Sequence, residues 1–331
     1  MNDNNPPANW ADRAVGLGAG LATALLFAAS TRGTGLAMAL AYFSPLPLLI
    51  GALGFSALGA LAGALLGAAL LAFLLDPALG IAFLAAFGAP ALIVGALARR
   101  AFPVKQGESA PLPQYVTPGA LLTVLCALAV IIAWIGVAVL TQHYHGFDAA
   151  LEALMTRFKE PLDQVVDNLK KMSPGIEGEP VKRLILLSAP AGVAASQTLL
   201  FAVNLWLAAR VVDISGRLGR PWPALPENLV LPRVVAPAFV IAVGLTFMGG
   251  LIGALAGAFA AAASLCLAIQ GLATLHVLTR DNKFRSFLLS ALYAMVFVLE
   301  PWSLLALALF GLVESALNLR ARRARRLSLK I

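Results

Sequence analysis

Ten apolar runs, separated by short polar or turn-forming segments, dominate the chain. They cover residues 14–30, 35–50, 52–75, 79–98, 119–140, 184–209, 234–249, 252–278, 287–299 and 302–319. A bilayer core takes about 20 apolar residues in helical form, and backbone in lipid has to satisfy its own hydrogen bonds. The pattern therefore predicts an all-α polytopic bundle of about ten transmembrane helices. The ninth run is short enough to be a re-entrant segment instead.

A different pattern fills residues 141–183, which carry six basic and seven acidic side chains. Apolar residues recur there at spacings of three and four from Phe147 to Met172, which predicts one amphipathic helix with a kink at Pro161. Such a helix would lie on the membrane surface or cap the bundle. The chain thus divides into a flexible tail (1–13), five helices (14–140), this extracytoplasmic segment (141–183), five more helices (184–319) and a basic tail (320–331).

Composition and charge sharpen this picture. Hydrophobic residues make up 60% of the 331 and charged residues 12%, against roughly 25% charged in soluble domains. The net charge of +8 comes from Lys and Arg between the apolar runs and at the C-terminus, so it indicates topology and not a nucleic-acid partner. Ten spans place seventeen of the 24 basic residues on one side. The positive-inside tendency makes that side the cytoplasm and predicts a multi-pass membrane protein with both termini cytoplasmic.

Some side chains in the runs suit close helix packing. Small residues four apart let two transmembrane helices approach closely. The third and eighth runs contain such glycines, namely Gly59, Gly63, Gly67, Gly253 and Gly257.

Polar side chains inside apolar runs are the candidate site residues. In the sixth and eighth runs, Gln197 and Asn204 share one helix face, and so do Gln270 and Thr274. Amides and hydroxyls in lipid either join helices or line a small-molecule site, and both alternatives stay open here.

Two ionisable side chains belong to the same candidate site. Glu314 in the tenth run is either a cation, proton or substrate contact, or it lies near the headgroups and pairs with Arg320 or a neighbouring loop. His276 is either an interfacial hydrogen-bond donor or a proton relay, and it is included among the candidate substrate-binding residues.

Several chemistries lack support. The chain contains no G-x-x-x-x-G-K-[ST], H-E-x-x-H or G-x-S-x-G motif, so no catalytic residues, no ATPase and no cofactor are predicted. His143, His145 and Asp148 are metal-competent, but the two histidines diverge on a helix, and no metal is predicted. Cys126 and Cys266 lie in apolar runs and suggest no disulfide framework.

The last third of the chain resembles a known family. Gln270-Gly271-Leu272-Ala273 and His276 are followed by a basic loop, a short helix with Tyr293, and Gly311-Leu312-Val313-Glu314 before Arg320. This arrangement resembles the YybS-like family, an uncharacterised family of bacterial predicted membrane proteins. The resemblance implies a location in the bacterial inner membrane. The resemblance implies kinship with the substrate-binding subunits of energy-coupling-factor vitamin transporters, which borrow an external ATPase. Those subunits have about six helices, so the ten runs and the 141–183 segment depart from their pattern.

Two function hypotheses follow. The first is a transporter-like protein that binds or moves a small molecule between the sixth, eighth and tenth helices. Its partners would be the bilayer, the small-molecule ligand and a separate ATPase or membrane partner subunit. The second is a non-transporting scaffold for envelope or cell-shape organisation, which would hold partners through the basic tail and the amphipathic segment.

Overall fold

The computed structural model describes residues 9–30, 34–104 and 112–328, and it confirms an all-α polytopic helical protein. Its elements in chain order are α1 (Trp10–Ser30), α2 (Gly35–Tyr42), α3 (Pro45–Gly54), α4 (Ala57–Leu74), α5 (Pro77–Phe83), the π-helical turn η1 (Leu84–Gly88), α6 (Ala89–Arg99), β1 (Ala101–Val104), β2 (Leu112–Tyr115), α7 (Pro118–His143), α8 (Phe147–Arg157), α9 (Lys159–Met172), α10 (Gly178–Ile214), α11 (Leu225–Asn228), α12 (Val235–Thr246), α13 (Gly250–Leu278), α14 (Arg285–Val298), α15 (Trp302–Leu317) and α16 (Leu319–Ser328).

The ten predicted runs correspond one by one to apolar helical segments. In the described part of the chain, seven segments are long and apolar enough to cross a membrane, and α12, α14 and α15 are shorter apolar helices. The outer surface agrees with this, because Phe73, Phe247 and Phe297 are each more than 85% exposed. Apolar surface on this scale is rare on soluble monomers, so lipid is the solvent that these helices face.

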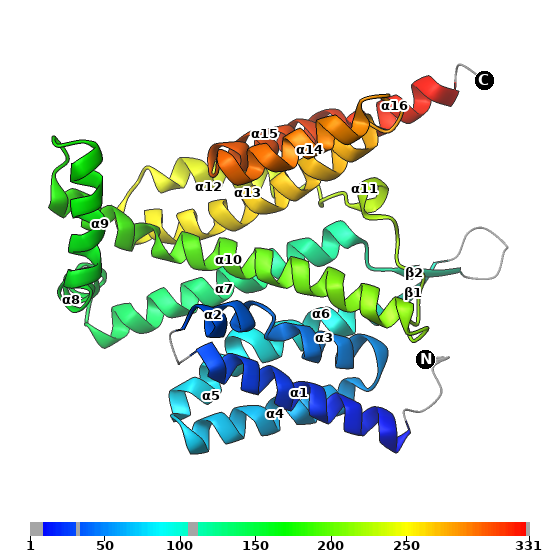
Figure 1. Cartoon of the computed structure of the whole chain (residues 1–331), viewed down its shortest axis with the longest axis horizontal. Coiled ribbons are helices and arrows are strands. Elements are labelled where there is room, and N and C mark those ends of the chain that lie inside the picture. The colour runs from blue at the N-terminus through cyan, green and yellow to red at the C-terminus, as the bar shows by residue number, and fades with distance from the viewer. Residues whose placement is uncertain (1–8, 31–33, 105–111, 329–331) are drawn as a thin grey trace.

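Two long helices run side by side through the middle of the molecule. α7 and α10 separate a layer built by α1 to α6 from a layer built by α12 to α15 (Figure 1). α10 packs against α3 on one side and against α13 on the other. The first turn of α1, the β1–β2 hairpin and α16 lie at one end, whereas α8 and α9 lie at the opposite end (Figure 1). The two-stranded antiparallel hairpin, which pairs Ala101 with Tyr115, was not predicted.

Glycines set the spacing of two helix pairs. Where α1 crosses α4, a Cβ on Gly16 would lie 2.6 Å from the backbone nitrogen of Ala60, and one on Gly59 would lie 2.5 Å from the carbonyl oxygen of Arg13. Gly63 lies against α1 in the same way, and Gly67 faces Ala24. The two backbones are therefore in direct contact. This contact maximises van der Waals attraction, which matters because the hydrophobic effect does not drive helices together within lipid.

The second glycine contact joins α13 to α15. Gly271 and Gly311 face each other so closely that a Cβ on either would overlap the other helix's backbone. The glycines predicted to pack in this helix behave differently. Gly253 approaches only the end of α12, with 3.0 Å from a built Cβ to the carbonyl oxygen of Thr246, and Gly257 has ordinary contacts at 4.0 Å. The close approach in α13 thus lies near its other end.

The second predicted helix is interrupted. It ends at Tyr42 and resumes at Pro45, and α3 continues to Gly54, so the predicted boundary near residue 51 is wrong. Prolines at 45 and 47 cannot donate helical hydrogen bonds, which favours a break here. Buried Thr23 of α1 repairs part of it, because its hydroxyl accepts a hydrogen bond from the Leu48 nitrogen (3.1 Å) and its carbonyl accepts one from the Ser44 hydroxyl (3.0 Å).

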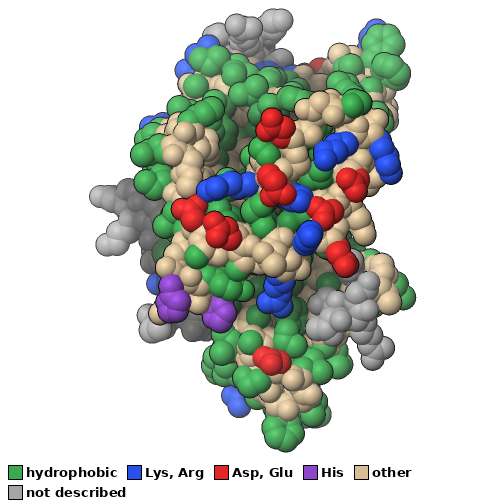
Figure 2. Space-filling model, turned by 90° about the vertical axis from the view of Figure 1, so that its left-hand side faces the viewer, with side chains coloured by type: hydrophobic (Ala, Val, Ile, Leu, Met, Phe, Trp, Pro, Cys, Tyr) green, Lys and Arg blue, Asp and Glu red, His purple; other side chains and the backbone are tan. Residues whose placement is uncertain are grey.

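The amphipathic segment forms two helices instead of one. α8 ends at Arg157 and α9 begins at Lys159, because Pro161 in the first turn of α9 cannot donate to the preceding turn. Acidic and basic side chains are interspersed over this end of the molecule (Figure 2). Ion pairs tie both helices to the start of α10: Lys182 lies 2.7 Å from Asp163, and Arg183 lies 2.7 Å from Asp148.

Candidate functional site

Gln197 and Asn204 point from α10 toward the first layer. The Asn204 side chain is buried, and its amide nitrogen donates to the carbonyls of Tyr42 and Leu200, both at 2.8 Å. Tyr42 is the last residue of α2, so Asn204 satisfies a carbonyl that the helix break leaves without its helical donor. The amide oxygen of Asn204 is buried and has no hydrogen-bond partner.

Gln197 faces a second irregularity. Its amide nitrogen lies 3.4 Å from the carbonyl oxygen of Ala86, within the π-helical turn η1 that joins α5 to α6. Such turns widen a helix by one residue and occur frequently at functional sites. The two amides of α10 therefore contact the two places where the spans of the first layer depart from regular helix.

Gln270 points the other way, into the second layer. Its amide oxygen accepts from the Leu231 nitrogen (2.7 Å), and its amide nitrogen donates to the Gly311 carbonyl (2.9 Å) and the Ser315 hydroxyl (2.7 Å). Thr274 bonds back to the Gln270 carbonyl at 2.9 Å. These buried groups join α13, α15 and the segment before α12 by hydrogen bonds.

Glu314 forms a buried ion pair with Arg320, the alternative that its position in the sequence left open. The carboxylate lies 2.9 Å from Nε of Arg320, with both side chains less than 10% exposed, and it also accepts from the Leu319 nitrogen at 2.8 Å. Arg320 donates in addition to the carbonyls of Pro226 (2.8 Å) and Leu229 (2.9 Å). The pair thereby fixes α16 and the 226–229 segment against α15. A cavity of about 350 Å³ adjoins it, lined also by Glu227 and Asn318.

The six predicted site residues therefore do not meet in one place. Gln197 and Asn204 serve the first layer, whereas Gln270, Thr274 and Glu314 serve the second. Of the six, only Glu314 and His276 line any of the four cavities described for the resolved ranges 9–30, 34–104 and 112–328. A single pocket lined by all six between α10, α13 and α15 is not among these cavities.

His276 belongs to a different cavity, of about 570 Å³, at the ends of α10 and α13. The chain from Trp222 to Leu229 and α14 complete its wall. Its polar lining comes from Arg210 and Asp213, whose charged groups lie 3.6 Å apart, and from His276, which lies 3.3 Å from the Tyr293 hydroxyl. The indoles of Trp206 and Trp222 supply flat apolar surface. Small-molecule sites are usually of this size and mixed character.

Charge is also organised around this cavity. Glu227, beside its wall, is paired with Arg280, and that guanidinium lowers the pKa of Glu227 below its ordinary value. Arg210 and Asp213 are each about half exposed, so both remain accessible to a polar ligand.

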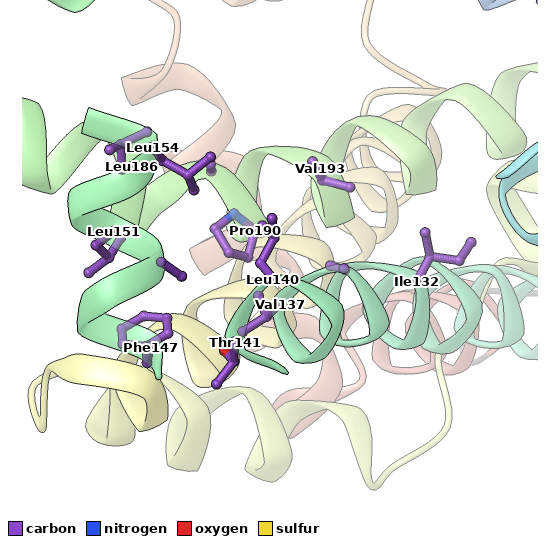
Figure 3. Close-up of a pocket in the computed structure, with 14 residues that line it drawn as sticks. Ile132, Val137, Leu140, Thr141, Phe147, Leu151, Leu154, Leu186, Pro190 and Val193 are labelled. Carbon is purple, nitrogen blue, oxygen red and sulfur yellow. The ribbon is translucent and has the colours of Figure 1, made fainter. Parts of the chain in front are cut away.

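An apolar groove of about 320 Å³ lies at the opposite end, between α7, α8 and α10 (Figure 3). Aliphatic side chains and Phe147 form nearly all of its wall, and Pro190 of α10 faces it. The one side-chain polar group in the wall is the Thr141 hydroxyl, which is buried without a partner. Nearby, His143 stacks edge-on against Tyr144, and Asp148 is engaged by Arg183.

Sequence reasoning missed most of the residues around the 570 Å³ cavity. Arg210 entered the prediction only as a topological charge, and Trp206 and Trp222 were not predicted as site residues. The sequence did contain one signal of a functional loop in this region. Arg220-Pro221-Trp222-Pro223 combines a cation, an aromatic ring and two rigid residues.

Comparison with known proteins places these features in a family. The family model described as "Predicted membrane protein (DUF2232)" matches residues 21–315. The match therefore includes every span from the second half of α1 to α15. No curated protein and no solved structure matches the chain significantly.

Proposed function

The chain belongs to the DUF2232 family of predicted membrane proteins, and we propose that it is a transporter-like protein of the inner membrane that binds a small molecule in the 570 Å³ cavity. One observation carries the proposal. In a bundle whose other polar side chains mostly bond to backbone, this cavity brings together Arg210, Asp213, His276 and Tyr293, and two indoles also line it. Such a lining suits a compact ligand with a flat ring and both hydrogen-bonding and charged groups.

The helix interruptions support a transporter-like role. Transporters commonly use discontinuous transmembrane helices, where backbone groups freed from the helix can bind substrate or ions. The α2–α3 break and the η1 turn are two such places, and Asn204 and Gln197 contact them from α10. We propose that Gln197 and Asn204 link the first layer to α10 while Gln270, Thr274 and Glu314 hold the second layer, with His276 contacting the ligand.

The proposal also covers the side of the membrane to which the cavity opens and the source of energy for transport. Arg210, Arg217, Arg220 and Arg280 cluster around the end of the bundle that carries the cavity, so the positive-inside tendency favours a cytoplasmic opening and cytoplasmic termini. The resemblance to YybS-like proteins, and through them to energy-coupling-factor subunits, suggests that a separate ATPase or membrane subunit would drive any transport.

The test is ligand binding by the purified protein in lipid nanodiscs. A panel of amino acids, nucleosides and water-soluble vitamins is screened for compounds that raise the midpoint of thermal unfolding. A true ligand stabilises the wild type and loses about tenfold or more in affinity in His276→Ala and Asp213→Asn, because each removes a hydrogen-bonding or charged contact. His143→Ala, an exposed histidine at the other end, is the matched control. Equal binding by all four proteins would refute the cavity as the site.

The scaffold remains a second candidate, favoured by the apolar groove at the α8 end and the arginine-rich helix α16. A chain truncated after Arg323 keeps the Glu314–Arg320 pair and the contacts of Arg323 with Leu278 and Asp281. Loss of a specific co-purifying partner on this truncation, with ligand binding unchanged, would favour the scaffold.

A further inference from the structure

Arg220 is a buried cation at the end of the bundle that carries the hairpin. It lies in the loop after α10, is 6% exposed, and its guanidinium stacks on two aromatic rings. The guanidinium carbon lies 4.7 Å from the ring centre of Trp222 and 5.3 Å from that of Tyr115. Nη1 donates to the Val116 carbonyl at 3.0 Å. These contacts fix the plane of the guanidinium and one of its edges.

The other edge carries donors without acceptors. Nε and Nη2 of Arg220 are both buried and have no hydrogen-bond partner, and the same holds for Nε1 of Trp222. Nε–H and Nη2–H lie side by side on one edge of a guanidinium, and together they form the fork that binds two oxygens of a carboxylate or phosphate. Buried polar groups are nearly always satisfied, so these three unpartnered donors on two side chains in contact need an explanation.

Among residues 9–30, 34–104 and 112–328, no carboxylate forms an ion pair that would explain these donors. The ion pairs formed among the described residues do not include Arg220. The two acids nearest to Arg220 in sequence are engaged elsewhere, because Asp213 pairs with Arg210 and Glu227 pairs with Arg280. Asp12 of α1 pairs with Arg217 at 2.8 Å. Burial lowers the pKa of Arg220, and Tyr115 opposes this, but a guanidinium remains protonated in proteins.

We propose that the Nε–Nη2 edge of Arg220, with Trp222 beside it, binds a phosphate group. A tetrahedral phosphate offers two oxygens to the fork and a further oxygen to an indole N–H, and it neutralises the buried charge. The position fits this chemistry, since α10 ends at Ile214 and α7 begins at Pro118, so Arg220 lies where the spans leave the apolar layer. The phosphate can come from a lipid headgroup or from solution. Trp222 also lines the 570 Å³ cavity, but the inference rests on the unpartnered edge of Arg220, which is not part of that wall.

The experiment measures the thermal unfolding midpoint of the full chain with two probes. Inorganic phosphate is titrated into the delipidated protein in a neutral detergent at constant ionic strength, with chloride as the matched anion. In parallel, the protein is placed in nanodiscs of phosphatidylglycerol or of a neutral glycolipid without phosphate. Stabilisation by inorganic phosphate identifies a free anion, whereas stabilisation by phosphatidylglycerol alone identifies a lipid headgroup.

Variants then assign the effect to the fork. Arg220→Lys keeps the charge but presents no bidentate edge, so we expect its apparent Kd for the effective probe to rise about ten- to hundredfold. Trp222→Phe keeps the ring stacking, removes one donor and should weaken binding less. Arg100→Lys is the control, because Arg100 also stacks on a ring, that of Phe102 at 5.1 Å, but is exposed. Equal stabilisation of wild type and Arg220→Lys, or no stabilisation by either probe, would overturn the proposal.

Discussion

At the scale of single residues, polar side chains inside the bundle mostly form hydrogen bonds with backbone groups. Asn204 donates to the carbonyl that ends α2, and Gln270 accepts from the Leu231 nitrogen before α12. Backbone groups in lipid cannot form hydrogen bonds with water. Each of these side-chain hydrogen bonds therefore removes a cost of several kcal/mol, of the order expected for a buried unsatisfied group. The same physics explains why the candidate site residues are dispersed, because breaks in the backbone occur in both layers.

The Glu314–Arg320 pair gives the sharpest prediction at this scale. We expect Glu314→Leu to lower the free energy of unfolding by about 3–5 kcal/mol, because it leaves a buried guanidinium uncompensated. Arg320→Met should cost a similar amount and also release the Pro226 and Leu229 carbonyls. The double variant should lose clearly less than the sum, since the second change removes the isolated charge left by the first. Denaturant unfolding in detergent measures all three.

The matched control for these single and double variants is Arg322→Met. Arg322 lies two residues after Arg320 on the same helix and is exposed. We expect it to change the free energy of unfolding by less than about 0.5 kcal/mol. Strict additivity of the Glu314 and Arg320 variants would contradict the pair as a coupled unit.

The residues themselves show how far sequence reasoning reaches here. Glu314 and Arg320 are six positions apart at a helix end, so their pairing could be expected as one of two alternatives. The contact of Asn204 with Tyr42 spans 162 positions, and it follows from how α10 packs on the first layer, which no local pattern encodes. The fork of Arg220 was missed for the same reason, because its isolation depends on which acids other arginines engage.

At the scale of elements, the α1–α4 contact predicts a contrast between two neighbouring glycines. Gly20→Ala would drive a methyl group into the backbone of Gly63 and Ala64, whereas Gly18→Ala, half a turn away, meets nothing within 4 Å. We expect Gly20→Ala to cost about 1–3 kcal/mol through overpacking. Gly18→Ala should be neutral or slightly stabilising, since alanine favours helix. Thermal unfolding of both variants compares them directly, and equal midpoints would contradict the observed crossing.

The docking of α9 on α10 should depend on pH. Lys182 lowers the pKa of Asp163 below its ordinary 3.8, and Asp163, with Glu179, raises the pKa of Lys182 above 10.5. The Asp163 contribution is therefore present above pH 3.8 and lost as the pH falls through its lowered pKa. The Lys182 contribution is present below pH 10.5 and lost as the pH rises through its raised pKa.

Spin labels on Asp167→Cys and Gly192→Cys can follow this contact. We expect a narrow distance distribution from about pH 5 to pH 9 that broadens at both extremes. The effect should be modest, because the Asp163 side chain is 41% exposed and buried Leu162 and Val166 still pack. Asp163→Asn should remove both transitions, because the remaining partner of Lys182, Glu179, lies on α10 itself and cannot hold α9. If the distance distribution does not change with pH in either protein, the ion pair does not contribute to the docking of α9 on α10.

The ten apolar helices could be predicted because length and hydropathy decide them directly. The interruptions of these helices are harder to predict from the sequence. Pro45 and Pro47 mark the α2–α3 break, but the apolar run continues through them, and only the hydrogen bonds from Thr23 and Asn204 make the break stable in lipid. Pro161 did indicate a disturbance, yet the structure places the end of α8 four residues earlier, at Arg157. The hairpin after α6 carries no strong strand signal.

At the scale of the whole molecule, α10 determines how the two layers can relate across the membrane. Its 37 residues make it about 55 Å long, well beyond the roughly 30 Å of a bilayer core. We therefore expect its two ends to reach opposite aqueous phases. The apolar groove and α8–α9 lie at one end, whereas the mixed cavity and Arg220 lie at the other (Figure 1).

This geometry makes the topology testable with two cysteines. Ser173→Cys follows α9 and Ser215→Cys follows α10, so they flank that helix and both are exposed. We expect a membrane-impermeant maleimide to label Ser173→Cys in intact spheroplasts, and Ser215→Cys only after permeabilisation, because the basic loop should face the cytoplasm. Native Cys126 and Cys266 are less than 5% exposed, so wild-type labelling gives the low background. Reversed labelling would place the cavity and the phosphate site outside, whereas labelling of both from one side would mean that α10 does not cross the membrane.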